Sequence, residues 1–258
     1  MDGGTQIHPL AIVEPGASLG VGVQIGPYAY VGQDVKLGDG CVVHHHGVVQ
    51  GNSFFGKANV IYPFAFIGGL SQDLKYDGSN APLTVGDRNV FREFSTVHCP
   101  STSLGHTRIG NDNHILAYGH VGHDCILEDH VLISSKAVLG GHVEVDSHAI
   151  VGGAAAVHQF CKIGCHAFLG GLSALVQDLL PYLIAEGNRA RMRTYNLVGL
   201  QRHGFSESDI AAVRHMFNRL YKEGRDRGLD GIAADDTIPL HLRQKMVDFR
   251  RRSTRGLA

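Results

Sequence analysis

The sequence predicts an all-β parallel β-helix followed by a small α-helical region. Three observations predict this fold class. Aliphatic residues recur every six positions over most of the chain, 34 of the 258 residues are Gly, and the period ends shortly before Pro181. Internal repeats of this kind determine the fold class before local propensities do. The chain is long enough for one large domain or for one domain with an appendage.

The six-residue period runs without a break through the first quarter of the chain and returns twice. Six residues suit one short strand plus one turn, and three such units close a triangular coil whose aliphatic side chains stack coil upon coil. Gly often follows the aliphatic residue, where the turn needs either positive φ or a close backbone approach. A β-sandwich would instead alternate with period two. The periodic positions are Ile7, Val13, Leu19, Ile25, Val31, Leu37, Val43, Val49, Phe55, Ile61 and Ile67, then Val85, Phe91 and Val97, then every sixth residue from Ile109 to Leu175.

Two segments interrupt the period, at residues 70–84 and near residues 99–108. We expect both to leave the coil as external loops, and binding residues tend to lie on loops that a rigid scaffold carries. The period stops after Leu175, which predicts a β-helix over residues 1–180 and a separate region over residues 181–258.

The C-terminal region carries helix signals. Ser206 begins an N-cap pattern that precedes an amphipathic run ending at Gly224, which predicts a helix. A second helix is expected from about Leu240 to Arg251, and a short one from Asn196 to His203. The sequence therefore predicts a small helical domain at this end.

Charge divides the chain in the same way. Residues 1–187 hold 8 Lys and Arg against 16 Asp and Glu, a formal charge of −8, whereas residues 188–258 hold 15 against 8, a charge of +7. A basic region suits an acidic protein or a phosphorylated ligand. The net charge of −1 and the 18% charged content exclude a uniformly basic nucleic-acid binder and a disordered chain.

The five cysteines are odd in number, form no CxxC pair and follow an N-terminus without a signal-peptide pattern, so we expect a cytoplasmic protein. No run approaches the roughly 18 apolar residues that span a bilayer, so we expect no membrane insertion.

Histidine is concentrated between residues 114 and 166. Because one coil takes 18 residues, the spacing between these residues predicts which of them lie over one another. Eighteen residues after His123 comes Gly141, and eighteen after Asp124 comes His142. We expect each pair to stack about 4.8 Å apart on neighbouring coils. His158 lies one coil beyond the same edge.

A His beside an Asp, next to a Gly backbone N–H, has the parts for acyl transfer, namely a general base and an oxyanion donor. The chain has no G-x-S-x-G motif and no obvious Cys and His nucleophile pair, which favours direct attack by a substrate hydroxyl. The alternative is a zinc site in which three histidines on neighbouring coils activate water, as in the hexapeptide-repeat carbonic anhydrases that this scaffold also resembles.

Five motifs in order give a more specific resemblance. They are QDLKY at residues 72–76, HVGHDC at 120–125, GGHV at 140–143, AVHQFC at 156–161 and STRGL near the end. With them the chain resembles the UDP-N-acetylglucosamine O-acyltransferase family, which catalyses the first step of lipid A biosynthesis. The resemblance implies a left-handed helix and a homotrimer with intersubunit sites. It also implies transfer of a β-hydroxyacyl group from acyl carrier protein to the sugar 3-hydroxyl, without a cofactor.

The resemblance also implies residue roles. His123 would be the general base, Asp124 its orienting partner, and Gly141 the donor of a backbone N–H to the thioester oxygen. Gly171 matches the position that sets acyl length, where Gly leaves room for a long chain. No metal ligand is implied. The residues expected to hold the sugar, the nucleotide or the carrier's phosphopantetheine are Gln72, Asp73, Lys75, His98, His120, His142, His158, Gln159, Asn196, Arg202 and His203.

The chain departs from the family pattern at a few positions. Cys99-Pro100 stands where Arg-Gly is common, Val198 where Glu is, His203 where Arg is, and Arg189 where His is. These differences keep two related reactions open. One is acylation of a 3-amino UDP-sugar, and the other is the N-acyltransfer later in the same pathway, whose enzymes usually carry an extra N-terminal domain before the repeats. A structural ice-binding solenoid would show an outward Thr array, and the outward positions here are varied and His-rich.

Overall fold

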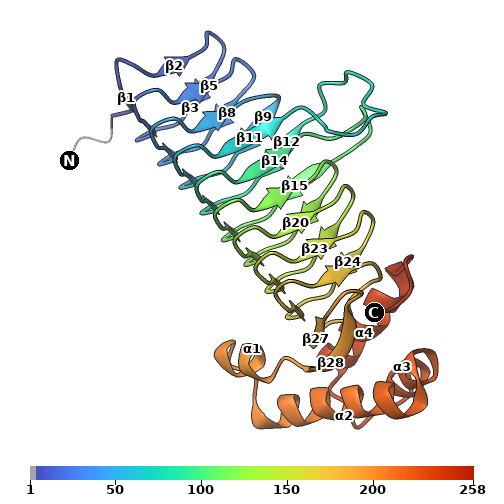
Figure 1. Ribbon diagram of the computed structural model, residues 1–258. Helices are drawn as coiled ribbons and strands as arrows, with labels where there is room; N and C mark the ends of the chain where they lie inside the picture. Colours follow the sequence, from blue (N-terminus) through green and yellow to red (C-terminus); the bar gives the residue numbers. More distant parts are fainter. Residues whose placement is uncertain (1–3) are drawn as a thin grey trace.

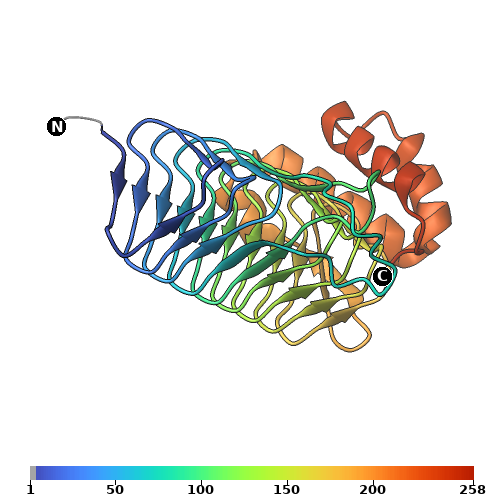
Figure 2. The same cartoon turned by 90° about the horizontal axis from the view of Figure 1, so that it is seen from above.

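A computed structural model describes residues 4–258 and shows a parallel β-helix with a group of helices at its C-terminal end (Figure 1). Figure 2 shows the coils stacked one behind another, with short strands on each face. The predicted fold class is confirmed.

Three sheets form the three faces of the β-helix, and each strand pairs in parallel with the strand one coil away. The first sheet contains β1 (Gln6–Ile7), β4 (Gln24–Ile25), β7 (Val42–Val43), β10 (Val60–Ile61), β13 (Val90–Phe91), β16 (His114–Ile115), β19 (Leu132–Ile133), β22 (Ile150–Val151), β25 (Phe168–Leu169), β27 (Leu183–Glu186) and β28 (Arg191–Tyr195). The second contains β2 (Ile12–Val13), β5 (Tyr30–Val31), β8 (Val48–Val49), β11 (Phe66–Gly69), β14 (Thr96–His98), β17 (His120–Val121), β20 (Val138–Leu139), β23 (Ala156–Val157) and β26 (Ala174–Leu175). The third contains β3 (Ser18–Leu19), β6 (Lys36–Leu37), β9 (Ser53–Phe55), β12 (Leu83–Val85), β15 (Thr107–Ile109), β18 (Ile126–Leu127), β21 (Glu144–Val145) and β24 (Lys162–Ile163).

The periodic aliphatic residues form the core. Ile61, Ile115 and Leu139 are fully buried, and Val121 pairs with Leu139 in register across one coil. The first coil is the exception, because no coil covers it in the described residues: Ile7 has 48% of its surface exposed, and Val13 and Leu19 are only partly buried. Burying one such side chain contributes about 1.5–3 kcal/mol, so the stack is the main source of stability.

At Gly26 and Gly38, glycine serves the coil through close approach rather than through positive φ. A Cβ on Gly26 would lie 2.8 Å from the backbone N of His45, and one on Gly38 would lie 2.4 Å from the carbonyl O of Gly56. The residue with positive φ comes two positions later, at Tyr28 after Gly26 and at Gly40 after Gly38. Side chains at these left-handed positions include Asp and His, which tolerate that conformation better than most residues do.

The two interruptions of the period are external loops, which Figure 1 shows as long excursions beside the middle coils. The first connects β11 with β12 through residues 70–82, and the second connects β14 with β15 through residues 99–106. Both loops leave the second sheet and return to the third, so they lie over the edge where those two sheets meet.

Beyond the coils, β27 continues the first sheet and β28 turns back antiparallel to it. The helices α1 (Leu197–Arg202), α2 (Glu207–Glu223) and α4 (Leu240–Arg252) lie where the sequence predicts them, and Ser206 caps α2 by accepting a hydrogen bond from Asp209 N. The sequence analysis did not predict α3 (Arg225–Ala233). No helix within residues 4–258 is long and apolar enough to cross a membrane.

Helix α4 is fastened to the coils by charge. Arg252 at its end pairs with Glu144 at 3.2 Å and with Asp146. Asp178 accepts hydrogen bonds from Ser253, Thr254 and Arg255, and so holds the segment that follows α4. Some of the basic residues of α4 therefore face the protein instead of solvent.

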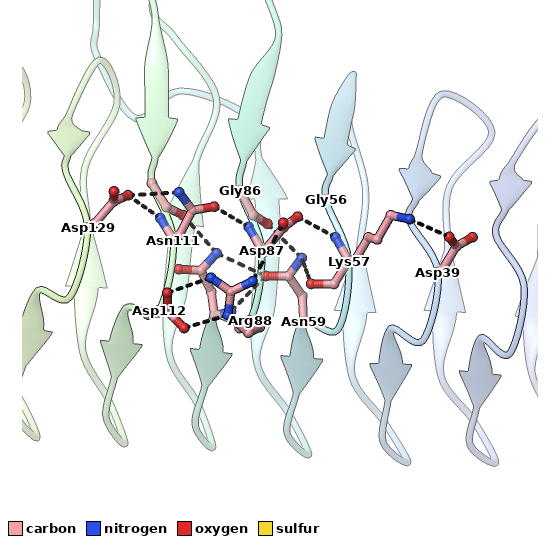
Figure 3. Close-up of polar contacts among 12 residues, drawn as sticks. Asp39, Gly56, Lys57, Asn59, Gly86, Asp87, Arg88, Asn111, Asp112 and Asp129 are labelled. Carbon is pink, nitrogen blue, oxygen red and sulfur yellow. Dashed lines mark hydrogen bonds and ion pairs between the residues drawn. The ribbon is translucent and has the colours of Figure 1, made fainter.

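Side-chain amides and carboxylates form a ladder along another edge, where the third sheet meets the first (Figure 3). Asn89 is fully buried. Its Nδ2 donates to Asn59 Oδ1 and to Gly110 O, each at 2.9 Å, and its Oδ1 accepts from Asn113 N at 2.9 Å. Asn113 is equally buried, but its side chain accepts a single bond, from Val131 N, and its Nδ2 has no partner among the residues described.

This difference predicts unequal effects on stability. Asn89→Ala removes three side-chain hydrogen bonds and leaves Asn113 N and Gly110 O unpaired, whereas Asn113→Ala removes one bond and leaves Val131 N unpaired. An unpaired buried group costs about 1–3 kcal/mol, so Asn89→Ala, which leaves one more such group, should lower the free energy of unfolding by roughly 1–3 kcal/mol more than Asn113→Ala does. Urea unfolding followed by circular dichroism measures both. Equal losses would show that the ladder contributes little.

Candidate functional site

His123 and Asp124 lie in the turn between β17 and β18, at the edge where the second and third sheets meet. Both residues are buried, and His123 Nδ1 lies 2.8 Å from Asp124 Oδ2. Because an ionised carboxylate only accepts hydrogen bonds, the Nδ1 proton is the donor and the Nε2 lone pair is left free. The backbone of Asp124 has φ of 59°, and this left-handed turn brings its carboxylate beside the preceding His.

The second loop holds the Asp124 carboxylate. Ser101 donates to Asp124 Oδ2 twice, from its backbone N at 3.0 Å and from its Oγ at 2.6 Å. Asp124 N in turn donates to Thr107 Oγ1 at 2.8 Å. Burial alone would raise the pKa of Asp124, but the hydrogen bonds from Ser101 and His123 outweigh it and hold the pKa below its usual value. The carboxylate is therefore ionised at neutral pH.

Sequence reasoning predicted the second loop but missed Ser101 and Thr107. The only available signal was a group of hydroxyl residues in a loop that starts one coil before His123. Gly105 belongs to the same contact, because a Cβ there would lie 2.1 Å from Asp124 Oδ1.

Gly141 lies one coil beyond His123, as the 18-residue spacing predicts. A Cβ at Gly141 would lie 2.4 Å from the His123 ring, so only Gly leaves room for the imidazole. Within residues 4–258 the Gly141 N–H has no hydrogen-bond partner. Lys57 and Asp87 occupy the same turn position on the edge that Figure 3 shows, where the third sheet meets the first. Their N–H groups donate to Asp87 Oδ1 and Asn111 Oδ1, respectively. An unused donor therefore lies beside the imidazole.

His142 and Asp73 complete the polar group around His123. His142 Nε2 lies 3.7 Å from Asp124 Oδ2, and its ring stands at 89° to that of His123. Burial lowers the pKa of His142. Asp73, in the first loop, places Oδ2 3.9 Å from His123 Nε2 and accepts from Lys75 N at 2.9 Å. A cavity of about 640 Å³ opens here, with Asp73, Lys75, Ser101, Asp124, His142 and Phe160 among its lining residues.

His98 lies one coil before His123, and His120 lies on the same coil as His123. Their ring centroids are 5.2 Å apart and their planes are tilted by 52°. His98 Nδ1 donates to Leu70 O at 2.8 Å, and His120 Nδ1 lies 2.8 Å from Thr96 Oγ1. Burial lowers both pKa values, that of His120 to about 4, and the neighbouring histidine charges add to the effect. Both imidazoles are therefore neutral at physiological pH.

Other predicted residues lie at the border of this group. Gln72 is exposed in the first loop beside Asp73. His158 and Gln159 are exposed on the coil after Gly141, and Arg255 approaches His158 Nδ1 at 3.3 Å. Cys99 is buried, and burial raises its pKa to about 11, so the side chain at the position where the resemblance led us to expect Arg is a neutral thiol.

Four predicted residues lie on other edges of the chain. Asn196 caps α1 by accepting from Gly199 N at 3.1 Å and donates to His166 O at 2.9 Å, at the edge where the third sheet meets the first. Arg202 and His203 are exposed at the end of the same helix. Gly171 is exposed at the edge between the first and second sheets. A single chain therefore does not bring these four residues to His123.

The zinc alternative required three converging histidines here. The group close enough to hold a metal ion at this edge is instead Asp73, His123 and His142, with one ligand atom from each within 4.8 Å of the others. This set differs from the three-histidine site that the alternative predicts.

Comparisons with known proteins identify the family. The model for domain 2 of UDP N-acetylglucosamine O-acyltransferase matches residues 178–258, and the bacterial transferase hexapeptide model matches residues 16–51. A curated acyl-[acyl-carrier-protein]–UDP-N-acetylglucosamine O-acyltransferase from Paraburkholderia phymatum is 44% identical over 98% of this chain and 99% of its own.

Two solved structures agree with this match. LpxA from Acinetobacter baumannii superposes with a TM-score of 0.93 at 35% identity, covering 98% of this chain and 99% of its own. The UDP-N-acetylglucosamine acyltransferase from Campylobacter jejuni gives a TM-score of 0.91 at 33% identity, covering 98% of each. The chain is therefore an enzyme that belongs to the acyl-carrier-protein-dependent UDP-N-acetylglucosamine O-acyltransferase family.

Proposed function

We propose that the protein transfers a β-hydroxyacyl group from acyl carrier protein to the 3-hydroxyl of UDP-N-acetylglucosamine, the first step of lipid A biosynthesis. The observation that carries this proposal is the pairing of the Asp124-bound imidazole of His123 with the unused N–H of Gly141 on the next coil. Family membership indicates the substrates, and the pairing of His123 with Gly141 provides a general base and an oxyanion donor for the acyl transfer between them.

His123 would act as the general base. Its Nδ1–H is held by Asp124 at 2.8 Å, so Nε2 can accept the proton of the sugar hydroxyl. The ionised Asp124 then stabilises the imidazolium. Asp73, 3.9 Å from Nε2, adds a second negative charge on the side where the proton arrives.

Gly141 would stabilise the transition state. The deprotonated hydroxyl oxygen attacks the thioester carbonyl, and the developing oxyanion accepts a hydrogen bond from the Gly141 N–H. Collapse of the tetrahedral intermediate breaks the C–S bond, and the departing thiolate takes the proton back from His123. The reaction therefore needs neither a covalent enzyme intermediate nor a cofactor of the enzyme's own.

We propose that a homotrimer completes the site. Asn196, Arg202, His203 and Gly171 lie on edges other than that of His123, so a neighbouring copy would have to bring them to the substrate. An exposed aromatic ladder supports such assembly. Phe64, Phe94 and Tyr118 stack at 5.1 and 4.9 Å between centroids along one edge, each with more than 40% of its surface exposed. Exposed apolar side chains that form a continuous row mark interaction surfaces more often than isolated ones do.

The remaining proposals follow from charge and thiols. The +7 charge of residues 188–258 would attract the acidic carrier protein and speed encounter.

The neutral His98, His120 and His142 would hydrogen-bond the sugar without repelling the proton from His123. All five cysteines are free and buried, and we place the protein in the reducing cytoplasm.

The second candidate is acylation of a 3-amino UDP-sugar, which the same base and oxyanion donor would serve. The residue that favours this candidate is Cys99, because a buried thiol stands beside the second loop where the resemblance predicts a cation. The N-acyltransferase of the same pathway is the more distant alternative.

The test is a direct assay with purified protein, UDP-N-acetylglucosamine and carrier proteins bearing β-hydroxyacyl chains of several lengths, read by product mass. We expect a 3-O-acylated UDP-sugar, and His123→Ala should lower kcat by about 10²–10⁴-fold without loss of fold. His130→Ala, on a different edge, is the matched control. Near-normal turnover by His123→Ala would exclude its role as base, and product only with the 3-amino sugar would favour the second candidate.

Ser101 is predicted to act as a positioning residue through Asp124. Ser101→Ala removes the Oγ donor, one of the three hydrogen-bond donors that lower the Asp124 pKa, so that pKa should rise and the acid limb of kcat/KM should move to higher pH. The kcat at the pH optimum should fall less than for His123→Ala, and Ser101→Thr should restore the profile. A uniform loss of activity at every pH would instead indicate a structural role.

Gly171 is predicted to limit acyl length. A Cβ at this position would meet only the backbone of Gly153, 3.2 Å from its carbonyl O, and no side chain of the described residues lies within 4 Å of it, so a long chain should be accepted. Gly171→Met should shift preference toward shorter acyl chains, measured as kcat/KM across the same panel. Gly153→Met, on the adjacent coil, is the matched control. An unchanged preference in Gly171→Met would assign the limit to another residue, such as the exposed Leu172.

A further inference from the structure

A second histidine cluster lies at the edge between the third and first sheets, away from His123. His148 and His166 occupy the same turn position on successive coils, with φ of 62° and 55°. Their rings stack in parallel with centroids 4.7 Å apart. His203, which caps the C-terminus of α1, lies against both, with ring centroids 4.7 Å from His148 and 5.0 Å from His166.

We propose that His148, His166 and His203 bind a divalent transition-metal ion of the zinc type. One ring nitrogen of each residue lies within 4.8 Å of the others. Imidazole nitrogen is a preferred ligand for zinc, nickel and copper, and three such ligands leave one position for water. The proposed activity uses this cluster neither as base nor as oxyanion donor. His203 is also expected near the substrate, but the metal binding proposed here is measured without that activity and does not depend on it.

The distances suit such an ion after a small movement. Zinc–nitrogen bonds of about 2.0–2.1 Å place tetrahedral ligands roughly 3.3 Å apart. His166 Nδ1 and His203 Nδ1 are 3.0 Å apart, close to that value. The wider gap to His148 requires its ring to tilt, and the cluster is partly open to solvent because His203 is exposed.

The protonation states also suit a metal ligand. Burial lowers the pKa of all three histidines, that of His166 to about 3, and the neighbouring imidazoles lower them further. Each ring is therefore neutral at pH 7 and has a lone pair. Without a metal, the contact between the two Nδ1 atoms needs a proton on one of them.

The backbone holds the three residues in place. Asn196 fixes the start of α1 to the coil by donating to His166 O at 2.9 Å, and His203 N donates to Gly199 O at 3.1 Å. Phe205 packs edge-on against His166 with ring centroids 5.0 Å apart. A bound ion would thus fasten the end of α1 to the β-helix, and α1 also carries Arg202. That consequence for nucleotide binding rests on the proposed function.

The experiment is a ZnCl₂ titration of the full-length, chelator-treated protein by calorimetry, with a parallel measurement of Tm. We expect zinc to bind and to raise Tm, and His203→Ala to weaken binding at least about ten-fold and to remove the Tm rise, because losing a ligand costs more than losing an outer contact. His203 is exposed, so its substitution should not unfold the chain. His130→Ala, which stacks on His148 at 4.7 Å but is not one of the three ligands, should bind zinc normally.

His142→Ala separates the two clusters, because it removes a potential ligand from the set Asp73, His123 and His142. Two bound equivalents, of which His203→Ala removes one, would support the proposal. No zinc binding by the unsubstituted protein would overturn it, as would binding that His142→Ala abolishes and His203→Ala leaves unchanged.

Discussion

The 18-residue stacking register is the constraint on which the rest of this protein depends. Val121 pairs with Leu139, and the carbonyl of His123 accepts from His142 N at 3.0 Å, so each turn overlies the next. The buried aliphatic column fixes this register, because a one-residue slip would move every core side chain outward. The register also places Gly141 under the His123 ring. A slip that brought His142 to this position would put a side chain where the imidazole needs empty space.

The sequence predicted what obeys the period. The repeat gave the fold class, the buried column and the stacking of His123 and Asp124 over Gly141 and His142. It could not place Ser101, because loop residues follow no repeat and the hydrogen bonds to Asp124 depend on the path of the loop. The sequence analysis also gave two alternative reasons for the recurring Gly residues, positive φ or close backbone approach. Only close approach applies at Gly26 and Gly38.

The C-terminal region was predicted less completely. Helix α3 follows α2 directly and contains Gly228 and Gly231, which weaken a helix pattern. Asn196, Arg202 and His203 were expected at the site of His123, and within one chain they lie on a different edge. No spacing argument could place them, because the period ends at Leu175 and tertiary contacts such as that of Asn196 with His166 decide their position.

The first coils of the β-helix have a different relation to function from the middle ones. The strands from β1 to β8 hold none of the proposed site residues, and each repeats the same pairing with the next coil. The number of coils at this end is therefore independent of the reaction, because gaining or losing a whole coil there would leave every neighbour of His123 in place. Between β14 and β23 the same change would separate the loops from the residues they hold. Mutation can change the number of coils at the N-terminal end, but not in the middle of the β-helix.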